Sequence, residues 1–216
     1  MDSLTLVIGS KNYSSWSLRA WLGLRAQGIP FEEILIPLDT HGTAERIRAQ
    51  SAAGLVPVLK DGPVTVWESL AILEYAAERF PEKDLWPVDR EARALARSVS
   101  HEMHAGFAAL RETCTMNCRR RYDSFGLDAD TRSDVARIVD IWALCRSKYG
   151  TGGAFLFGAF SNADAMYAPV VSRFVTYGVE LDAGARAYTD AVMAHPAMQE
   201  WLAAGEDEPV IEKYEC

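Results

Sequence analysis

The chain reads NYSSWSLR at residues 12–19, directly after the apolar run LTLVI at residues 4–8. The run predicts a buried strand, and the apolar pattern beyond it predicts a helix over residues 15–27. Hydroxyls clustered where a strand passes into a helix lie at the positive end of the helix dipole. They cap the helix, and the same position can hold an anion, including a thiolate.

Strand-like and helix-like segments alternate through the first 80 residues. We expect strands over 4–8, 31–38, 56–59 and 64–67, and helices over 15–27, 43–50 and 68–80. The turn sequence KDGP at residues 60–63 joins the last two strands as a hairpin. The first two strands are joined by a helix and are therefore expected to be parallel. This order predicts an α/β domain.

The pattern becomes helical after a turn-rich connector at residues 81–88. We expect helices over 89–118, 129–149, 162–177, 183–194 and 197–204. Glycines separate these segments. The sequence therefore predicts an α/β domain at residues 1–80, a linker at 81–88 and an all-α domain at 89–216. The acid-rich tail that follows Gly205 is expected to be exposed.

Charge and cysteine content exclude several classes of protein. The net charge of −8 argues against a nucleic-acid partner, and the single basic run, Arg119–Arg121, reads as a solvated helix end or as a contact for an acidic substrate. The apolar stretch before Gly9 is too short and too acidic to be expected to act as a signal peptide, and we expect no membrane span because no apolar segment has the necessary length. The four cysteines all lie beyond residue 113, and their spacing does not suggest a disulfide framework. We therefore expect a cytoplasmic protein.

The dipeptide Val56-Pro57 has two interpretations. A trans proline at the start of an edge strand would remove one donor from the ladder and have no further role. A cis bond would turn the chain so that the backbone of Val56 faces outward, where an extended peptide can pair with it. The dipeptide by itself does not decide between them.

The pair Glu68-Ser69 stands at the expected start of a helix. Ser69 is suited to cap that helix, and its hydroxyl and the free N–H groups beside it can also bind a carboxylate. Glu68 would supply the negative partner for an ammonium group. Together the two residues suit the head group of an α-amino acid.

The sequence thus offers three binding positions: the serine hydroxyls before the first helix, the backbone of Val56, and the pair Glu68-Ser69. A short γ-linked peptide that carries a thiol would satisfy all three. The residues that define them, YSSWSLR at 13–19, VPVL at 56–59 and Glu68-Ser69, resemble the glutathione S-transferases, and the resemblance covers essentially the whole chain. Residues 161–164 (SNAD) match the capping box (S-x-x-D) that this family carries before its core helix. The serine cluster looks most like the serine-using zeta- and theta-like classes.

The resemblance implies a thioredoxin-like N-terminal domain, an all-α C-terminal helical domain and a homodimer. Glutathione would be the co-substrate, held by Val56, Pro57, Glu68 and Ser69, with no metal. The hydroxyl of Ser14, or alternatively that of Ser15, would stabilise its thiolate for attack on a small electrophile. The implied role is a detoxifying transferase. A glutathione-dependent isomerase or dehalogenase, and a non-enzymatic binding or regulatory protein, are the alternatives.

The sequence departs from the family pattern at two places. Trp16 stands where the zeta motif has cysteine, and no cysteine precedes Cys114, which excludes a dithiol centre or a nucleophilic cysteine in the N-terminal domain. Positions 54 and 55 are Gly and Leu, where the family often has lysine or glutamine for the glycine carboxylate of glutathione. His41, Lys11 and Gln50 are the candidates for that contact.

Two smaller signals lie in the helical part. His101 and His104 fall three residues apart on one expected helix, a spacing that suits a metal, but without an evident third ligand we assign them to the surface or an interface. By the family fold, Cys114 and Cys118 lie near the cleft between the domains. They either pack there or contact the second substrate.

Overall fold

A four-stranded mixed sheet forms the N-terminal domain. In the computed structural model, which describes residues 3–215, β1 (Leu4–Gly9) pairs in parallel with β2 (Phe31–Ile36) and antiparallel with β3 (Val58–Asp61). β4 (Val64–Trp67) pairs antiparallel with β3, which gives the order β2-β1-β3-β4. The parallel first pair is joined through a helix, as the sequence pattern predicts.

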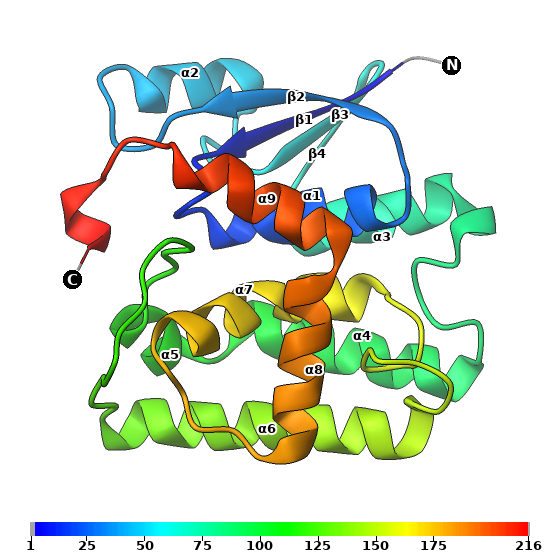
Figure 1. The fold of residues 1–216 in the computed structure, drawn as a ribbon. Coiled ribbons are helices and arrows are strands. Elements are labelled where there is room, and N and C mark those ends of the chain that lie inside the picture. Colours follow the sequence, from blue (N-terminus) through cyan, green and yellow to red (C-terminus); the bar gives the residue numbers. More distant parts are fainter. Residues whose placement is uncertain (1–2, 216) are drawn as a thin grey trace.

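Helices cover both faces of this sheet (Figure 1). α1 (Ser15–Ala26) and α3 (Ser69–Arg79) lie between the sheet and the helical domain, and α2 (Thr43–Gln50) lies on the opposite side. Because α1 packs against the sheet on one side and the helical domain on the other, Leu18 and Leu22 are both fully buried. A helix covered on both sides needs no polar face.

The C-terminal domain is built around a buried central helix. Its helices are α4 (Arg90–Ala105), α5 (Ala108–Thr113), α6 (Ala129–Tyr149), α7 (Asn162–Thr176), α8 (Ala183–Ala194) and α9 (Pro196–Glu206). Short 3-10 turns lie at Pro81–Lys83 and Glu212–Tyr214. α7 packs on α1, α4 and α8, which joins the two domains in one apolar core. Among the described residues, no helix is both long and apolar enough to cross a bilayer. The expected fold class is confirmed.

The segment expected to form one helix over residues 89–118 contains two. The helix ends at Ala105, and Phe107 adopts a left-handed backbone conformation with φ of 58°. The backbone turns at Gly106 so tightly that a Cβ there would lie 2.8 Å from the carbonyl oxygen of Glu102. α5 then ends at Thr113, and no helix is assigned between it and Ala129. The spacing of apolar residues continues through Gly106 and Phe107, so the sequence pattern does not indicate that the helix ends there.

The acid-rich tail is largely exposed, as expected, and it is also bound to the rest of the protein. The Glu208 carboxylate accepts hydrogen bonds from the backbone N–H groups of Lys11 (2.7 Å) and Asn12 (2.9 Å). Arg119, which is not at a helix end, donates to the carbonyl oxygens of Glu206 and Glu208. The tail's acids are thus used to pair with backbone and arginine groups of the N-terminal turn and the helical domain.

The start of α7 carries the expected capping box. The Asp164 carboxylate accepts hydrogen bonds from the backbone N–H (2.8 Å) and the hydroxyl (3.0 Å) of Ser161, and from the backbone N–H of Leu156 (3.0 Å). Asp164 is completely buried, and burial raises its pKa to about 6 against the effect of these donors. The carboxyl group therefore fixes the loop before the central helix.

We expect Asp164→Ala to lower the free energy of unfolding by about 3 kcal/mol, because it leaves buried donors without partners. The matched control is Asp182→Ala, which removes an exposed carboxylate that caps α8 through the Ala185 N–H. That change should cost about 1 kcal/mol. Urea unfolding followed by circular dichroism measures both values, and equal losses would contradict a special role for the α7 box.

Candidate functional site

Two adjoining hollows lie where the β1–α1 turn and the segment before β3 meet the helical domain. Their volumes are about 510 Å³ and about 350 Å³, and they share Trp16, Leu55 and Val56. The larger is also lined by Tyr13, Ser14, Ser15, Leu38, Ile47, Gly54, Arg111, Thr115, Met116, Arg173 and Tyr214, and the smaller by Pro57, Trp67, Glu68 and His104. The structure thus brings the three predicted motifs to one cleft.

The hydroxyls at the start of α1 differ in what they contact. Ser14 caps the helix: its Oγ accepts from the Ser17 N–H (3.3 Å) and donates to the Ser17 Oγ (2.8 Å). Ser17 Oγ also accepts from the Gly9 N–H at 3.0 Å, so it links the helix to the end of β1. Within residues 3–215 the Ser15 hydroxyl makes no hydrogen bond. Ser15 is therefore free to donate to a ligand, whereas Ser14 must first release Ser17.

The Val56-Pro57 bond is cis. The strand that follows, β3, lies between β1 and β4, so the interpretation as an edge-strand proline is wrong. Val56 contributes to the walls of both hollows. It precedes β3, so its backbone lies outside the β3 ladder.

Glu68, not Ser69, occupies the N-cap position of α3, so the expected capping role of Ser69 is wrong. Ser69 is the first residue of the helix, and its Oγ is buried without a hydrogen-bond partner among the described residues. Glu68 adopts φ of 69°, a conformation that costs a non-glycine residue about 1–3 kcal/mol. Glu68 lines the smaller hollow and Ser69 lies directly behind it, and a strained residue beside a buried unpaired hydroxyl is a feature found at binding sites.

The charge of Glu68 is available to a ligand. Its carboxylate is 49% exposed and lies 3.7 Å from Nε2 of His104. Burial, with a further contribution from Arg19, lowers the pKa of His104, so the imidazole is neutral near pH 7. A neutral imidazole does not neutralise the carboxylate, which can therefore pair with an ammonium group.

Of the candidates for the glycine carboxylate, only His41 has a free side chain. Lys11 Nζ pairs with Glu33 at 2.9 Å, and Lys60 donates to the Gln50 side chain at 2.7 Å. Lys11 also packs between the rings of two buried tryptophans, Trp21 and Trp201. The structure therefore does not bring Lys11 into the cleft, and His41 lies exposed between β2 and α2.

The sequence analysis assigned His104 to the surface or an interface, but the residue lines the smaller hollow, and Arg111, Arg173 and Arg48 were missed altogether. His104 lies edge-on to the Trp16 ring at 5.2 Å between centroids, and Arg111 and Arg173 line the larger hollow from α5 and α7. A cationic residue on α2, Arg48, lies beside Gly54: its Cγ would be 3.5 Å from a Cβ at that position. None of the three arginines belongs to a motif that the sequence analysis singled out, and only the tertiary fold brings them to the cleft.

Cys114 and Cys118 pack in the core and do not line the cleft. Both thiols are buried, and burial raises the pKa of each to about 11. Their neighbours Thr115 and Met116 reach the larger hollow instead. The interpretation as packing residues is confirmed, and neither thiol is a reactive nucleophile at neutral pH.

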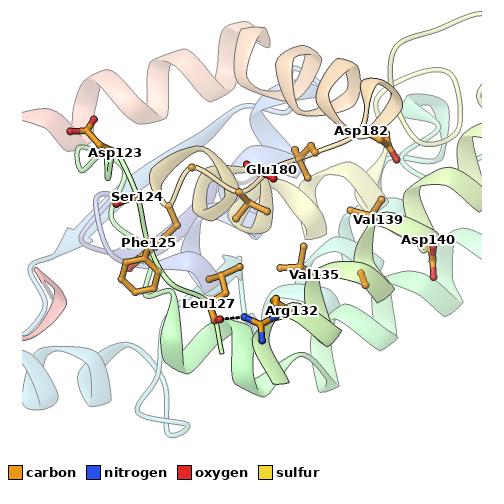
Figure 2. Close-up of a pocket in the computed structure, with 15 residues that line it drawn as sticks. Asp123, Ser124, Phe125, Leu127, Arg132, Val135, Val139, Asp140, Glu180 and Asp182 are labelled. Atoms are coloured by element: carbon orange, nitrogen blue, oxygen red, sulfur yellow. Dashed lines mark hydrogen bonds between the residues drawn. The ribbon is translucent and has the colours of Figure 1, made fainter. Parts of the chain in front are cut away.

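A third cavity, of about 680 Å³, lies apart from these motifs (Figure 2). It is formed by the loop at residues 123–127, α6 and the α7–α8 connection, and its rim carries Asp123, Asp140 and Glu180. Arg132, also at the rim, donates to the Leu127 carbonyl oxygen. This cavity includes no residue from the predicted motifs.

Comparison with known proteins identifies the family. Residues 13–79 match the family model described as glutathione S-transferase, N-terminal domain, and residues 101–204 match the one for the C-terminal domain. Maleylacetoacetate isomerase of Rattus norvegicus is 35% identical over 172 residues, which are 78% of this chain and 77% of that protein. The chain belongs to the glutathione S-transferase family.

Other relatives of this transferase-family chain agree. Glutathione S-transferase 1 of Dianthus caryophyllus is 32% identical over 110 residues, a match that spans about half of each protein (50% and 49%). A glutathione transferase homolog from Burkholderia, solved with bound glutathione, superposes with a TM-score of 0.73 over 96% of this chain and 100% of that one. At 23% identity, that likeness shows the fold.

The unpaired hydroxyl of Ser69 gives a test of the transferase site. We expect Ser69→Ala to leave the free energy of unfolding unchanged or raise it by up to about 1 kcal/mol, because a buried hydroxyl without a partner is removed. Glutathione affinity should fall about tenfold, through loss of a hydrogen bond to a carboxylate.

Ser100→Ala is the control, because Ser100 Oγ in α4 is equally buried and without a partner. It should change stability in the same way and leave affinity unchanged. Calorimetric titration with glutathione measures the affinities. Equal affinities for the wild type and Ser69→Ala would remove Ser69 from the site.

Proposed function

We propose that this protein is a glutathione transferase that uses a hydroxyl-stabilised glutathione thiolate to attack a small electrophile. The observation that carries the proposal is the meeting of Ser14 and Ser15, the backbone of Val56 and the carboxylate of Glu68 in one cleft. Each group suits a different part of a γ-linked thiol tripeptide, and family membership supports their joint use.

Glutathione would lie across the shared wall of the two hollows. Its γ-glutamyl ammonium would pair with Glu68 and its carboxylate with Ser69 and the first N–H groups of α3. Its cysteine would pair with the backbone of Val56 beside Pro57. The glycine carboxylate would then lie toward Gly54, where Arg48 is beside it and His41 is the remaining candidate from the sequence.

The start of α1 can supply the energy that a thiolate requires. Lowering a thiol pKa by about two units needs about 2.7 kcal/mol. A hydrogen bond to a charged group contributes about 1.5–3 kcal/mol, and a helix N-terminus adds about 0.3–1 kcal/mol. One serine hydroxyl and the dipole of α1 therefore suffice, and the structure favours Ser15 or, after release of Ser17, Ser14 as the donor.

A glutathione-dependent isomerase is the second candidate, because the relative from Rattus norvegicus is named maleylacetoacetate isomerase. It would use the same thiolate and return it at the end of each turnover. Consumption of glutathione in step with product distinguishes a transferase from an isomerase. The zeta motif has a cysteine at the position of Trp16. This difference in the cleft counts against the isomerase.

We further propose a cytoplasmic homodimer with a role in detoxification. The edge strand β4 exposes two apolar side chains, Val64 (41%) and Trp67 (51%). They lie at the two ends of β4, whose outer edge has no partner strand among the described residues, and an unpaired edge that carries exposed apolar side chains favours coverage by another chain. A second subunit that covered β4 would also shield the smaller hollow, since Trp67 lines it.

The test is an ultraviolet titration of the glutathione thiolate bound to wild type, Ser14→Ala and Ser15→Ala. We expect the wild type to lower the thiol pKa by about two units and one variant to lose most of that shift. Ser17→Ala is the control for damage to the turn, since Ser17 bonds Gly9 and Ser14 only. It should lower stability and keep part of the pKa shift.

Glutathione binding with an unshifted pKa in the wild type would contradict hydroxyl activation. Absence of any binding would contradict the transferase and favour a binding or regulatory protein. Retention of the shift in both single variants would mean that neither hydroxyl is required alone, and the double variant then decides.

A further inference from the structure

Three arginines meet beneath and beside Trp16. The guanidinium of Arg19 lies 4.3 Å from the centroid of the Trp16 ring, and that of Arg111 lies 5.6 Å from it. Arg173 lines the same hollow as Arg111 and Trp16. The side chains come from α1, α5 and α7, so the cluster exists only in the folded chain.

Arg19 is the most unusual member of the cluster. It is completely buried, and none of its three guanidinium nitrogens has a hydrogen-bond partner among the described residues. Burial, together with the charges of Arg173 and Arg111, lowers its pKa to about 9. A guanidinium of that pKa is still protonated at pH 7, so a full positive charge lies unpaired behind the Trp16 ring.

Within residues 3–215, the hydrogen bonds of the other two arginines all go to neutral groups. Arg173 donates to the carbonyl oxygens of Cys114 (2.7 Å) and Pro169 (3.3 Å), and Arg111 donates to that of His104 (3.3 Å). Carbonyl oxygens satisfy N–H donors but do not cancel the charge. Burial and the charge of Arg111 both lower the pKa of Arg173. Arg173 is thus repelled by the neighbouring arginine, as Arg19 is.

No carboxylate is among the groups that chiefly affect the pKa of Arg19 or of Arg173, and the Asp134 carboxylate, which reaches α5 from α6, accepts a hydrogen bond from the Leu110 backbone N–H. The Cys114 and Cys118 thiols and the Tyr167 phenol have raised pKa values and are neutral, and so is the His104 imidazole. Glu68 faces the smaller hollow, and the Glu215 carboxylate is held by Tyr13, Asn117 and Arg120. Three like charges thus lie together in a partly dry site, an arrangement that an anion would stabilise.

We propose that the electrophile of this enzyme carries a carboxylate, and that Arg111 and Arg173 bind it in the larger hollow while Arg19 strengthens the positive field from behind Trp16. The inference rests on the proposed transferase function and adds the substrate class. Arg111 and Arg173 line the same hollow as Ser14 and Ser15, so a carboxylate bound there would hold the electrophile beside the thiolate. Arginine is the side chain best suited to a carboxylate because its planar fork donates two parallel hydrogen bonds.

A matched pair of electrophiles tests the proposal: 4-chloro-3,5-dinitrobenzoate and its methyl ester. In both, the glutathione sulfur forms a bond to the ring carbon, and chloride leaves with the electron pair of the carbon–chlorine bond. Each kcat/KM is divided by the uncatalysed rate constant, which removes the difference in intrinsic reactivity. We expect the wild type to favour the acid by about tenfold or more, from a charge-assisted hydrogen bond present only with the acid.

Arg111→Gln and Arg173→Gln should each reduce this preference toward one, because each slows turnover of the acid more than turnover of the ester. Arg137→Gln is the control, because Arg137 is exposed and pairs with Glu102 on the surface. It should keep the preference. Arg173 is buried, so its replacement can also destabilise the fold. A measurement on the wild type avoids this problem: benzoate should inhibit the enzyme about tenfold more strongly than benzamide, which has the same shape and no charge.

Three outcomes would overturn the proposal. One is an equal normalised rate for acid and ester in the wild type, and another is a preference that survives both arginine variants. The third is an Arg111→Gln enzyme that slows acid and ester equally and raises the pKa of bound glutathione, since the cluster would then serve the thiolate. Failure of wild type to bind glutathione would contradict the transferase instead, and benzoate binding would still report on the arginines.

Discussion

The cleft depends on one small hydrogen-bond cluster at the end of β1. Ser17 Oγ accepts from the Gly9 N–H and from the Ser14 hydroxyl, so the last residue of the strand, the helix cap and the first turn of α1 share one oxygen. This sets where α1 begins, and with it the position of Ser15 and Trp16. Because Trp16 lines both hollows, this turn sets the position of a wall that the two hollows share.

Much of the fold was predictable because the helix and strand preferences of short segments agree with the structure that those segments adopt in the folded protein. The helices at Thr43–Gln50, Ala129–Tyr149 and Ala183–Ala194 have the bounds that their apolar periodicity predicts. The capping box before α7 was also readable, because its two residues lie three apart and act on one helix end. Boundaries failed where a single backbone conformation decides them, as at Phe107, whose positive φ breaks a continuous apolar pattern.

The candidate site was predictable only where its residues lie in short motifs. The serines, Val56 and Glu68 are read from their neighbours in sequence. Arg111 and Arg173 have no such neighbours, and their roles arise from the packing of α5 and α7 against α1. The contacts of the tail were unpredictable for the same reason: its exposure follows from its acidic composition, but the backbone groups that Glu208 binds lie far away in the sequence.

The hydrogen bonds from the Lys11 and Asn12 amides to Glu208 link the N-terminal half of the protein to the end of the helical half. The carboxylate and the amides that it binds are separated by 197 and 196 positions in the chain. The N-terminal half has its own sheet, yet the turn that presents its serines has two backbone donors that only the far end of the helical half satisfies. During synthesis these two N–H groups can be paired only after Glu208 has been made. An N-terminal half produced by itself would have the serine-bearing turn with both donors unpaired.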